Sequence, residues 1–260
     1  MPEIEIVSPD ILKQKPTAVI FDTDNTLYDY EPAHRQALKA TCDKAIQLLG
    51  ISSEEFLRSY ALARDKVKFQ LSGTASSHSR LLYFQRLIEI LGVRTQIQST
   101  LDLYQTYWRT FLTNSKLFSE VREFIFDLRD SGIATAVVTD LTAQIQFRKL
   151  IYFRLDDQFD FVVTSEEAGA DKPHEQPFRL AMEKLNVGPE LVWMIGDDAA
   201  KDIGGARNMG MFALQKRHHG VVVDQRKFRP DIIFDTFGAL RKACRQSGVF
   251  GVAKSSHNLT

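Results

Sequence analysis

Residues 18–27 read Ala-Val-Ile-Phe-Asp-Thr-Asp-Asn-Thr-Leu, an apolar run that ends abruptly in two acids. A strand of this composition is typical of a parallel sheet, in which both faces are buried. Asp22 and Asp24 then fall at the carboxyl end of the strand, where open α/β sheets place their reactive groups. Two carboxylates in one loop repel each other unless a cation or a proton lies between them. Such a pair can bind a hard metal such as Mg²⁺, and it can divide nucleophilic and acid–base roles between its members.

A second acid cluster follows another apolar run near the far end of the chain. Residues 191–195 are Leu-Val-Trp-Met-Ile, and Gly196, Asp197, Asp198 and Asp202 come directly after them. A cluster of three acids after a buried strand favours a bound cation over a simple helix cap. Two such clusters in one chain are poorly explained by coincidence.

Apolar runs of strand length alternate with helical patterns along the chain. The strand-like runs lie at 18–21, 134–138, 161–164, 191–195, 211–214 and 231–234. Helical patterns between them lie at 118–130, 141–150, 176–185 and 202–208. This alternation predicts an α/β fold with a parallel sheet and right-handed crossovers.

A long insertion separates the first two strand-like runs. Residues 30–115 contain almost no strand pattern, and their apolar side chains recur at helical spacing, which predicts about four amphipathic helices. An insertion after the first acidic loop is placed to cover the carboxyl edge of the sheet as a lid. We therefore expect a discontinuous core (1–29 and 115–246), a helical domain (30–114) and a flexible Gly/Ser-rich tail (247–260).

Composition narrows the class of protein. The chain has 260 residues and equal numbers of acidic and basic side chains, so net charge gives no drive toward nucleic acid or membrane. Cys42 and Cys244 are expected to be free thiols in a reducing compartment. No apolar run is long enough to cross a bilayer, and no basic segment precedes an apolar core at the N-terminus. We expect a cytoplasmic protein, a monomer or homodimer, without nucleic-acid or membrane partners.

Four segments together resemble the motifs of the haloacid dehalogenase (HAD) superfamily, most of whose members are Mg²⁺-dependent phosphatases. They occur in the family's order: residues 22–26 (Asp-Thr-Asp-Asn-Thr), 137–139 (Val-Val-Thr), 172–173 (Lys-Pro) and 195–202, which contains Gly-Asp and the later Asp202. The resemblance spans about residues 15–240 and implies a Rossmann-like core with a small all-α cap. One departure is Asp140, where relatives often carry Asn.

The resemblance also implies roles for single residues. Asp22 is the expected nucleophile, which forms an aspartyl phosphate, and Asp24 is the acid–base that protonates the leaving alcohol and then activates water. Lys172 is expected to neutralise Asp22 and the phosphate, which Thr139 and Asp140 also contact. The expected ligands of Mg²⁺ are Asp22, Asp24 through its backbone carbonyl, and Asp197. Asp198 or Asp202 is expected to supply a further ligand or to hold a metal-bound water, and Asp202 is favoured for the outer position.

The substrate is expected to be a small soluble phosphomonoester, because a lid excludes larger molecules. Sugar phosphates, phosphoglycolate-like acids, acyl-sugar phosphates and nucleoside monophosphates remain open. Candidate contacts from the helical domain, each alone more typical of a solvated charge, are His34, Arg35, Lys39, Lys66, Lys68, His78 and Arg80. The adjacent His218 and His219 lack acidic or cysteine neighbours and are expected to be a solvated loop pair.

Three alternatives stay open on sequence alone. A 2-haloacid dehalogenase is disfavoured by Asp24, since breaking a carbon–halogen bond leaves no alkoxide to protonate. A phosphomutase would keep the aspartyl phosphate but return the phosphate to a sugar. A non-catalytic phosphate-ester-binding protein would keep the fold without turnover, and the intact set of Asp22, Asp24, Lys172 and Asp197 argues against it.

Overall fold

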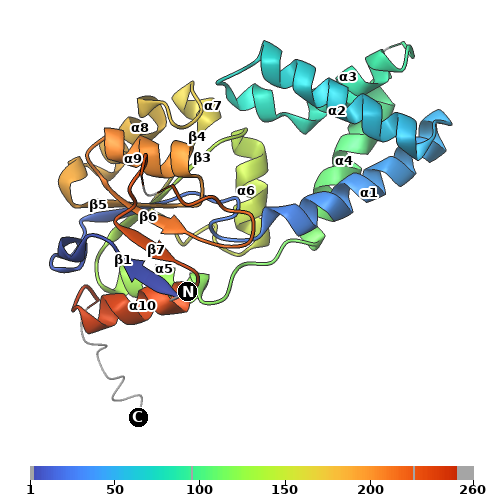
Figure 1. The fold of residues 1–260 in the computed structure, drawn as a ribbon. Helices are drawn as coiled ribbons and strands as arrows, with labels where there is room; N and C mark the ends of the chain where they lie inside the picture. The colour runs from blue at the N-terminus through green and yellow to red at the C-terminus, as the bar shows by residue number, and fades with distance from the viewer. Residues whose placement is uncertain (1–2, 95, 225, 251–260) are drawn as a thin grey trace.

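The computed structural model describes residues 3–94, 96–224 and 226–250. The chain forms two lobes, a sheet-containing core and a helical lobe made by α1–α4 (Figure 1). The core holds both ends of the described chain, and the helical lobe projects from one edge of it (Figure 1).

Seven strands of the described residues form one sheet in the order β1-β7-β6-β5-β2-β3-β4. The strands are β1 (Ile4–Ile6), β2 (Ala18–Phe21), β3 (Ala134–Thr139), β4 (Phe161–Thr164), β5 (Val192–Gly196), β6 (Phe212–Lys216) and β7 (Ile232–Phe234). All neighbours are parallel except β1 and β7, which are antiparallel. The parallel α/β class is therefore confirmed, and β1 is an edge strand that the sequence pattern did not reveal.

The central strand β2 lies between β3 and β5, and the chain changes direction across the sheet there. In register, Phe21 of β2 lies beside Val137 of β3 and Ile195 of β5. From β2 the chain adds β3 and β4 on one side, and then β5, β6 and β7 on the other. Such a switch point leaves a crevice beyond the carboxyl ends of the strands, which is where open α/β sheets bind ligands.

Helices cover both faces of the sheet (Figure 1). One face packs against α5 (Val121–Asp130) and α10 (Phe237–Gln246), with Phe124, Phe237 and Leu240 fully buried. The other face packs against α8 (Glu175–Leu185) and α9 (Gly205–Asn208) through residues such as Phe178. Helices α6 (Ala143–Tyr152) and α7 (Ser165–Ala168) follow β3 and β4.

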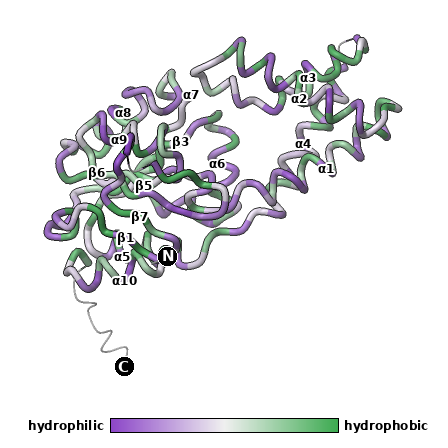
Figure 2. The backbone as a smooth tube through the Cα atoms, viewed as in Figure 1, coloured by the Kyte–Doolittle hydropathy of each residue, from purple (hydrophilic) through white to green (hydrophobic). Residues whose placement is uncertain are grey.

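The core owes its stability mainly to burial of apolar side chains on both faces of the strands. Hydrophobic residues run through the sheet, and hydrophilic residues alternate with them along the surrounding helices (Figure 2). Every residue of β2 and β5 is buried, as expected for central parallel strands. Cys42 and Cys244 are free and buried, which agrees with the expected thiols.

The helical lobe is a bundle of α1 (Tyr30–Leu49), α2 (Ser53–Gln70), α3 (Arg80–Ile90) and α4 (Ile97–Thr113). Ser52 and Ser79 accept hydrogen bonds from backbone N–H groups in the first turns of α2 and α3, so local capping fixes where these helices begin. Aromatic residues such as Phe56, Tyr83 and Phe84 form the interior of the bundle. A short 3₁₀ helix, Ala75–His78, lies in the connection between α2 and α3.

The two connections between the lobes run side by side. The Phe118 N–H donates to the Leu27 carbonyl over 2.9 Å, and Tyr28 and Leu117 form an isolated antiparallel bridge. The loop that carries Asp22 and Asp24 therefore leads directly into these paired connections.

Several boundaries differ from the sequence-based expectation. The strand expected at 211–214 runs from Phe212 to Lys216, and the helical segment expected from 202 begins at Ala199 with a π-helical turn. Within the tail expected at 247–260, Val249 and Phe250 are buried, and Phe250 packs edge-on against Phe124. Residues 251–260 of the expected tail lie outside the described residues.

Within the described ranges 3–94, 96–224 and 226–250, no helix combines the length and the apolar character that crossing a membrane requires.

Candidate active site

The acidic residues of both clusters meet at the switch point of the sheet. Asp22 follows β2, Thr139 ends β3, and Asp197 follows β5, so all three lie at the same edge. The Asp22 N–H donates to the Ile195 carbonyl over 2.9 Å, which extends the pairing of β2 and β5 to the first acid. The parallel register thus brings together residues that are 175 positions apart (197 minus 22).

Lys172 lies between two carboxylates at the base of this crevice. Its Nζ is 2.6 Å from Asp22 Oδ1 and 2.6 Å from Asp202 Oδ1, and all three side chains are buried. Burial favours the neutral amine, but the charges of Asp202 and Asp22 outweigh it and raise the pKa of Lys172 well above its usual value. Lys172 is therefore a fixed positive charge beside the expected nucleophile.

One ammonium group does not balance the acids around it. Carboxylate oxygens of Asp22, Asp197 and Asp202 lie within 4.8 Å of one another. Burial, together with repulsion from the neighbouring acids, raises the pKa of Asp22 to about 7 and that of Asp197 to about 9. Burial likewise raises the pKa of Asp202. Among the described residues, none donates a hydrogen bond to the Asp197 carboxylate.

Gly196 makes this close approach possible. A Cβ atom on Gly196 would lie 2.3 Å from the Cβ of Asp202, far inside van der Waals contact. Asp202 can therefore fold back under the end of β5 only because residue 196 has no side chain. This gives a physical reason for the glycine that precedes Asp197.

Asp22, Asp197 and Asp202 fit a hard divalent cation. The donor set consists of carboxylate oxygens, which Mg²⁺ prefers, and excess negative charge remains after Lys172 is counted. Asp198 lies outside this group. It is exposed, and its Oδ1 accepts hydrogen bonds of 2.9 Å from the backbone N–H groups of Ala200 and Lys201, so it caps the following turn.

The Asp24 carboxylate borders the same cavity but pairs with a lysine outside the acid cluster. Its Oδ1 is 2.7 Å from Lys149 Nζ and also accepts hydrogen bonds from the hydroxyls of Tyr28 and Thr23. Burial alone would raise the pKa of Asp24, but the Lys149 charge and these hydrogen bonds lower it below its ordinary value. Asp24 is consequently held as a carboxylate in this arrangement.

Sequence reasoning missed Lys149, although a signal for it exists. In α6, Lys149 and Gln146 are polar, yet both are buried and share a face with Ile145 and Leu150. A lysine on the apolar face of an amphipathic helix is unusual enough to suggest a buried partner. The identity of that partner, Asp24, depends on the tertiary structure.

Thr139 is held by polar neighbours rather than by solvent. Its hydroxyl lies 2.8 Å from the Thr23 hydroxyl and accepts a 2.8 Å hydrogen bond from Gln146 Nε2. Thr139 still borders the central cavity. Its hydroxyl position is thus fixed before any ligand arrives.

Asp140, which directly follows Thr139, makes two defined contacts. Its Oδ1 accepts from the Lys172 backbone N–H over 2.9 Å, and its Oδ2 pairs with Lys201 Nζ at 2.9 Å. The first contact needs only a carbonyl-type oxygen, which Asn also has, whereas the second uses the negative charge. Asp140 therefore helps to place Lys172, and Lys201 is a further cation that the sequence analysis did not single out.

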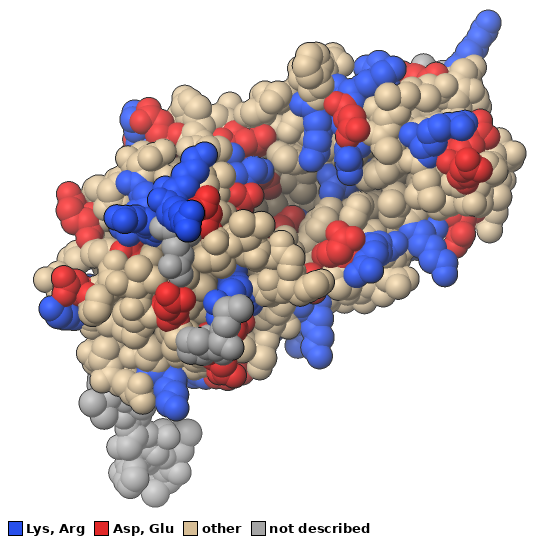
Figure 3. Space-filling view, in the orientation of Figure 1, with Lys and Arg blue, Asp and Glu red and all other residues tan. Residues whose placement is uncertain are grey.

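A cavity of about 470 Å³ lies above these residues and below the helical lobe. In the space-filling view, acidic atoms lie deep in the recess between the lobes and basic side chains border it on the side of the helical lobe (Figure 3). Of the seven candidates from the helical lobe, four border this cavity: His34, Lys68, His78 and Arg80. Arg35, Lys39 and Lys66 do not, and Arg64, which the sequence analysis did not name, does.

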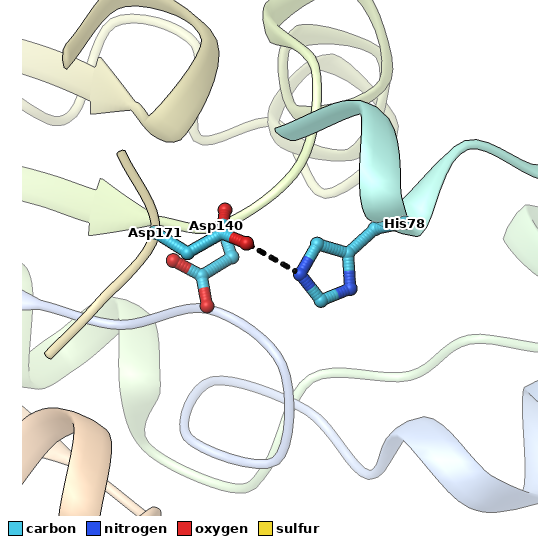
Figure 4. Close-up of side chains that lie close together, drawn as sticks. All are labelled: His78, Asp140 and Asp171. Carbon is cyan, nitrogen blue, oxygen red and sulfur yellow. Dashed lines mark hydrogen bonds and ion pairs between the residues drawn. The ribbon is translucent and has the colours of Figure 1, made fainter. Parts of the chain in front are cut away.

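His78 connects the helical lobe to the core beside Lys172. Its Nε2 lies 3.1 Å from Asp171 Oδ2, and Asp140 lies alongside this pair (Figure 4). The Asp171 N–H also donates to the Gly73 carbonyl over 3.0 Å. Contacts from the lobe therefore reach the residue that immediately precedes Lys172.

His218 and His219 border a second cavity rather than the one above Lys172. His218 is half-buried, with its ring 5.6 Å from that of Phe118, so it is less solvated than expected. Neither histidine belongs to a cluster of potential metal ligands among the described residues.

Comparison with known proteins agrees with this geometry. A sequence profile of the haloacid dehalogenase-like hydrolases matches residues 16–210. The chain is 37% identical over 196 residues to a ribulose-1,5-bisphosphate 5-phosphatase from Halopiger xanaduensis. The matched region covers 75% of this chain and 82% of that protein. The chain is 30% identical over 204 residues to a glyceraldehyde 3-phosphate phosphatase from Methanopyrus kandleri, covering 77% of this chain and 83% of that protein. The structure of a HAD phosphatase from Thermococcus onnurineus superposes with a TM-score of 0.65 at 26% identity, covering 88% of this chain and 97% of that one. The chain belongs to the haloacid dehalogenase-like hydrolase family.

Proposed function

We propose that this protein is a Mg²⁺-dependent phosphatase that hydrolyses a small phosphomonoester through an aspartyl phosphate on Asp22. The observation that carries the proposal is the buried contact of Lys172 with Asp22 and Asp202 at the floor of a cavity that Asp24 also borders. A nucleophile, a fixed positive charge and a second carboxylate thus face one space. The phosphatase names of the relatives support the same reaction class.

In the first step, a carboxylate oxygen of Asp22 attacks phosphorus and the bond to the leaving oxygen breaks. Asp24 gives a proton to the leaving oxygen. Because Lys149 lowers the pKa of Asp24, the negative phosphate must offset this effect for Asp24 to carry that proton. In the second step, Asp24 takes a proton from water, the resulting hydroxide attacks phosphorus, and Asp22 is released with inorganic phosphate.

The cation would be held by the carboxylates of Asp22 and Asp197 and by the backbone carbonyl of Asp24. Asp202 lies beside them but already pairs with Lys172, so it is better placed to orient than to bind. The chemistry that Mg²⁺ supplies when bound is positive charge opposite the phosphate oxygens and relief of the repulsion among the acids. Of Asp198 and Asp202, Asp202 lies within the acid cluster and would hold a metal-bound water there, whereas Asp198 lies outside the cluster and caps the following turn.

The proposed substrate is a small phosphorylated metabolite enclosed under the helical lobe, which we interpret as a cap. A cavity of about 470 Å³ suits a molecule of that size. The substrates named for two relatives, ribulose-1,5-bisphosphate and glyceraldehyde 3-phosphate, are of this kind. Thr139 and Lys172 would contact the phosphate, and Asp140 would act on it through its hydrogen bond to the Lys172 backbone.

The test is phosphate release in Mg²⁺ across a panel of small phosphomonoesters, with Asp22→Asn as the control. We expect turnover that excess chelator stops and that Asp22→Asn lowers at least about a thousand-fold, because the nucleophile is lost. Because burial and repulsion raise the pKa of Asp22, the neutral Asn should leave the melting temperature unchanged or higher. Undiminished turnover in the folded variant would reject Asp22 as the nucleophile. Turnover in excess chelator would reject the requirement for Mg²⁺.

Other products would assign the site to a different reaction. Isomerisation of a sugar phosphate with little free phosphate would indicate a mutase, and halide release from a haloacid without Mg²⁺ would indicate a dehalogenase. Binding of an ester without turnover would indicate a non-catalytic protein.

A further inference from the structure

The cavity above Lys172 has two chemically different ends. Its floor carries the acids of the core, among them Asp22, Asp197 and Asp202. The wall from the helical lobe carries Arg64, Lys68 and Arg80, and the acid on that wall, Glu31, pairs with Arg35 outside it. The residues of the floor are sufficient to bind a phosphate and a cation, so the positively charged wall is left without a role.

Arg80 is the most unusual residue on this wall. Its guanidinium lies 5.3 Å from the ring centre of Tyr83, 5.4 Å from that of Tyr107 and 5.9 Å from that of Trp108. It donates to the His78 carbonyl over 2.7 Å and to the Tyr30 hydroxyl.

The contacts of Arg80 leave its charge unbalanced. The guanidinium pairs with no carboxylate among the described residues, and its buried Nε has no hydrogen-bond partner there. Holding a guanidinium among aromatic rings without an anion is costly unless something else supplies the negative charge.

Lys68 and Arg64 continue the positive wall toward the opening. Both lie on α2, and both are exposed. Arg64 pairs with its neighbour Asp65 at 3.0 Å, whereas Lys68 has no ion pair with any residue that the structure describes. Although the residue as a whole is exposed, partial loss of water around its charge, with further lowering from Arg64, Arg80 and Lys201, depresses the pKa of Lys68, so these cations act on one another. Repulsion of this kind is relieved when an anion binds between them.

We propose that Arg80, with Lys68 and Arg64 beside it, binds a second anionic group of the substrate, a phosphate or a carboxylate, while the floor of the cavity holds the phosphate that is removed. This proposal rests on the proposed phosphatase function and narrows its substrate to small metabolites with two anionic groups. Arg80 is the main contact to this second anionic group, because the surrounding aromatic rings and its hydrogen bonds fix the plane of its guanidinium. Lys68 adds charge near the opening.

The experiment compares substrates that differ in one anionic group. Glycerol 3-phosphate is paired with 3-phosphoglycerate, and ribulose 5-phosphate with ribulose 1,5-bisphosphate. Initial rates of phosphate release give kcat and KM for each. We expect the native enzyme to prefer the member with the second anionic group. Arg80→Gln should lower this preference about 10- to 100-fold, mainly through KM, because one charge-assisted contact is lost.

Matched variants separate binding from structure. Lys66 lies on the same helix as Lys68 but does not border the cavity, so Lys66→Met should leave the preference unchanged, whereas Lys68→Met should lower it several-fold. Arg80→Lys should retain part of the preference. If Arg80→Gln does not fold, as judged by circular dichroism, Lys68→Met and Arg64→Gln decide the outcome.

The possible results distinguish this proposal from the phosphatase function itself. Equal losses for both members of a pair, or an unchanged preference in folded Arg80→Gln, would overturn the second-anion site and leave the phosphatase intact. If no ester is hydrolysed, the thermal shift caused by 3-phosphoglycerate or ribulose 1,5-bisphosphate still tests the site. A shift that Arg80→Gln and Lys68→Met reduce would support it, and no shift, or one that these variants leave unchanged, would reject it.

Discussion

Lys149 Nζ lies 2.7 Å from Asp24 Oδ1, although the two residues are 125 positions apart in sequence. The lysine is almost fully buried and lies 5.7 Å from the ring centre of Trp108 and 5.6 Å from that of Phe111, both in α4. One side chain of the core therefore touches both the proposed acid–base residue and the helical lobe. The position of Asp24 depends on how the lobe packs against α6.

Replacement of Lys149 should impair turnover more than binding. Lys149→Met leaves Asp24 without its ion pair, so we expect kcat to fall about 10- to 100-fold while KM changes little. Lys149→Arg should restore part of the rate because it keeps the charge. Steady-state kinetics on any ester that the enzyme hydrolyses would measure this. An unchanged kcat in Lys149→Met would show that the ion pair does not position Asp24 for the reaction.

Asp197→Asn should abolish stabilisation by Mg²⁺. Binding at a hundred times the dissociation constant stabilises a folded protein by about 2.7 kcal/mol, which a thermal melt detects. Without the metal, the variant should melt at a higher temperature than the native protein, because repulsion and burial already raise the pKa of Asp197 to about 9.

Asp198→Asn is the matched control for Asp197→Asn. Its side chain caps a turn, which Asn also does well, and it lies outside the acid cluster, so the Mg²⁺ response should persist. Loss of the response in Asp198→Asn and its retention in Asp197→Asn would reverse the assignment.

Two substitutions of Asp140 should distinguish the contributions of its two contacts to the free energy of unfolding. Asp140→Asn keeps the oxygen for the Lys172 N–H and loses the pair with the partly exposed Lys201, so we expect a cost of about 0.5 kcal/mol. Asp140→Ala also leaves that N–H without an acceptor, which should cost about 1–3 kcal/mol. Urea unfolding of the two variants would measure the difference, and equal costs would mean that the hydrogen bond to Lys172 contributes little.

His34 should make the protein sensitive to acid. Burial, with the nearby charges of Arg80 and Arg64, lowers the pKa of His34 from 6.5 to about 4. The unfolded chain then binds the proton more tightly, so stability is lost as pH falls from about 6.5 toward 4.

The variant His34→Gln isolates this effect from other titrating groups. Between pH 7 and pH 5.5 it should lose about 1 kcal/mol less stability than the native protein. Urea unfolding at the two pH values provides the comparison. An equal loss of stability in both proteins would show that protonation of His34 does not destabilise the folded state.

Much of the fold follows from local patterns in the sequence. The continuous apolar runs of β2 and β5 indicate strands that are buried on both faces. The helical spacing of apolar residues over 30–113 indicates helices that are buried on one face. Both patterns can be recognised within a short window of sequence. The edge strand β1 was missed because two of its three residues are only partly buried, Ile6 is exposed, and the strand pairs antiparallel with β7. A three-residue segment carries too little periodicity to be recognised.

The sequence by itself determined which acids lie at strand ends, because an apolar run followed by Asp is a local signal, and it determined that Asp22, Asp24, Asp197 and Asp202 share one edge of a parallel sheet. Only the tertiary structure decided their partners. The pairing of Asp24 with Lys149, the bridge of Lys172 between Asp22 and Asp202, and the packing of Arg80 against the rings of Tyr107 and Trp108 all join separate elements. Such contacts depend on how helices pack over the sheet, which no short window of sequence encodes.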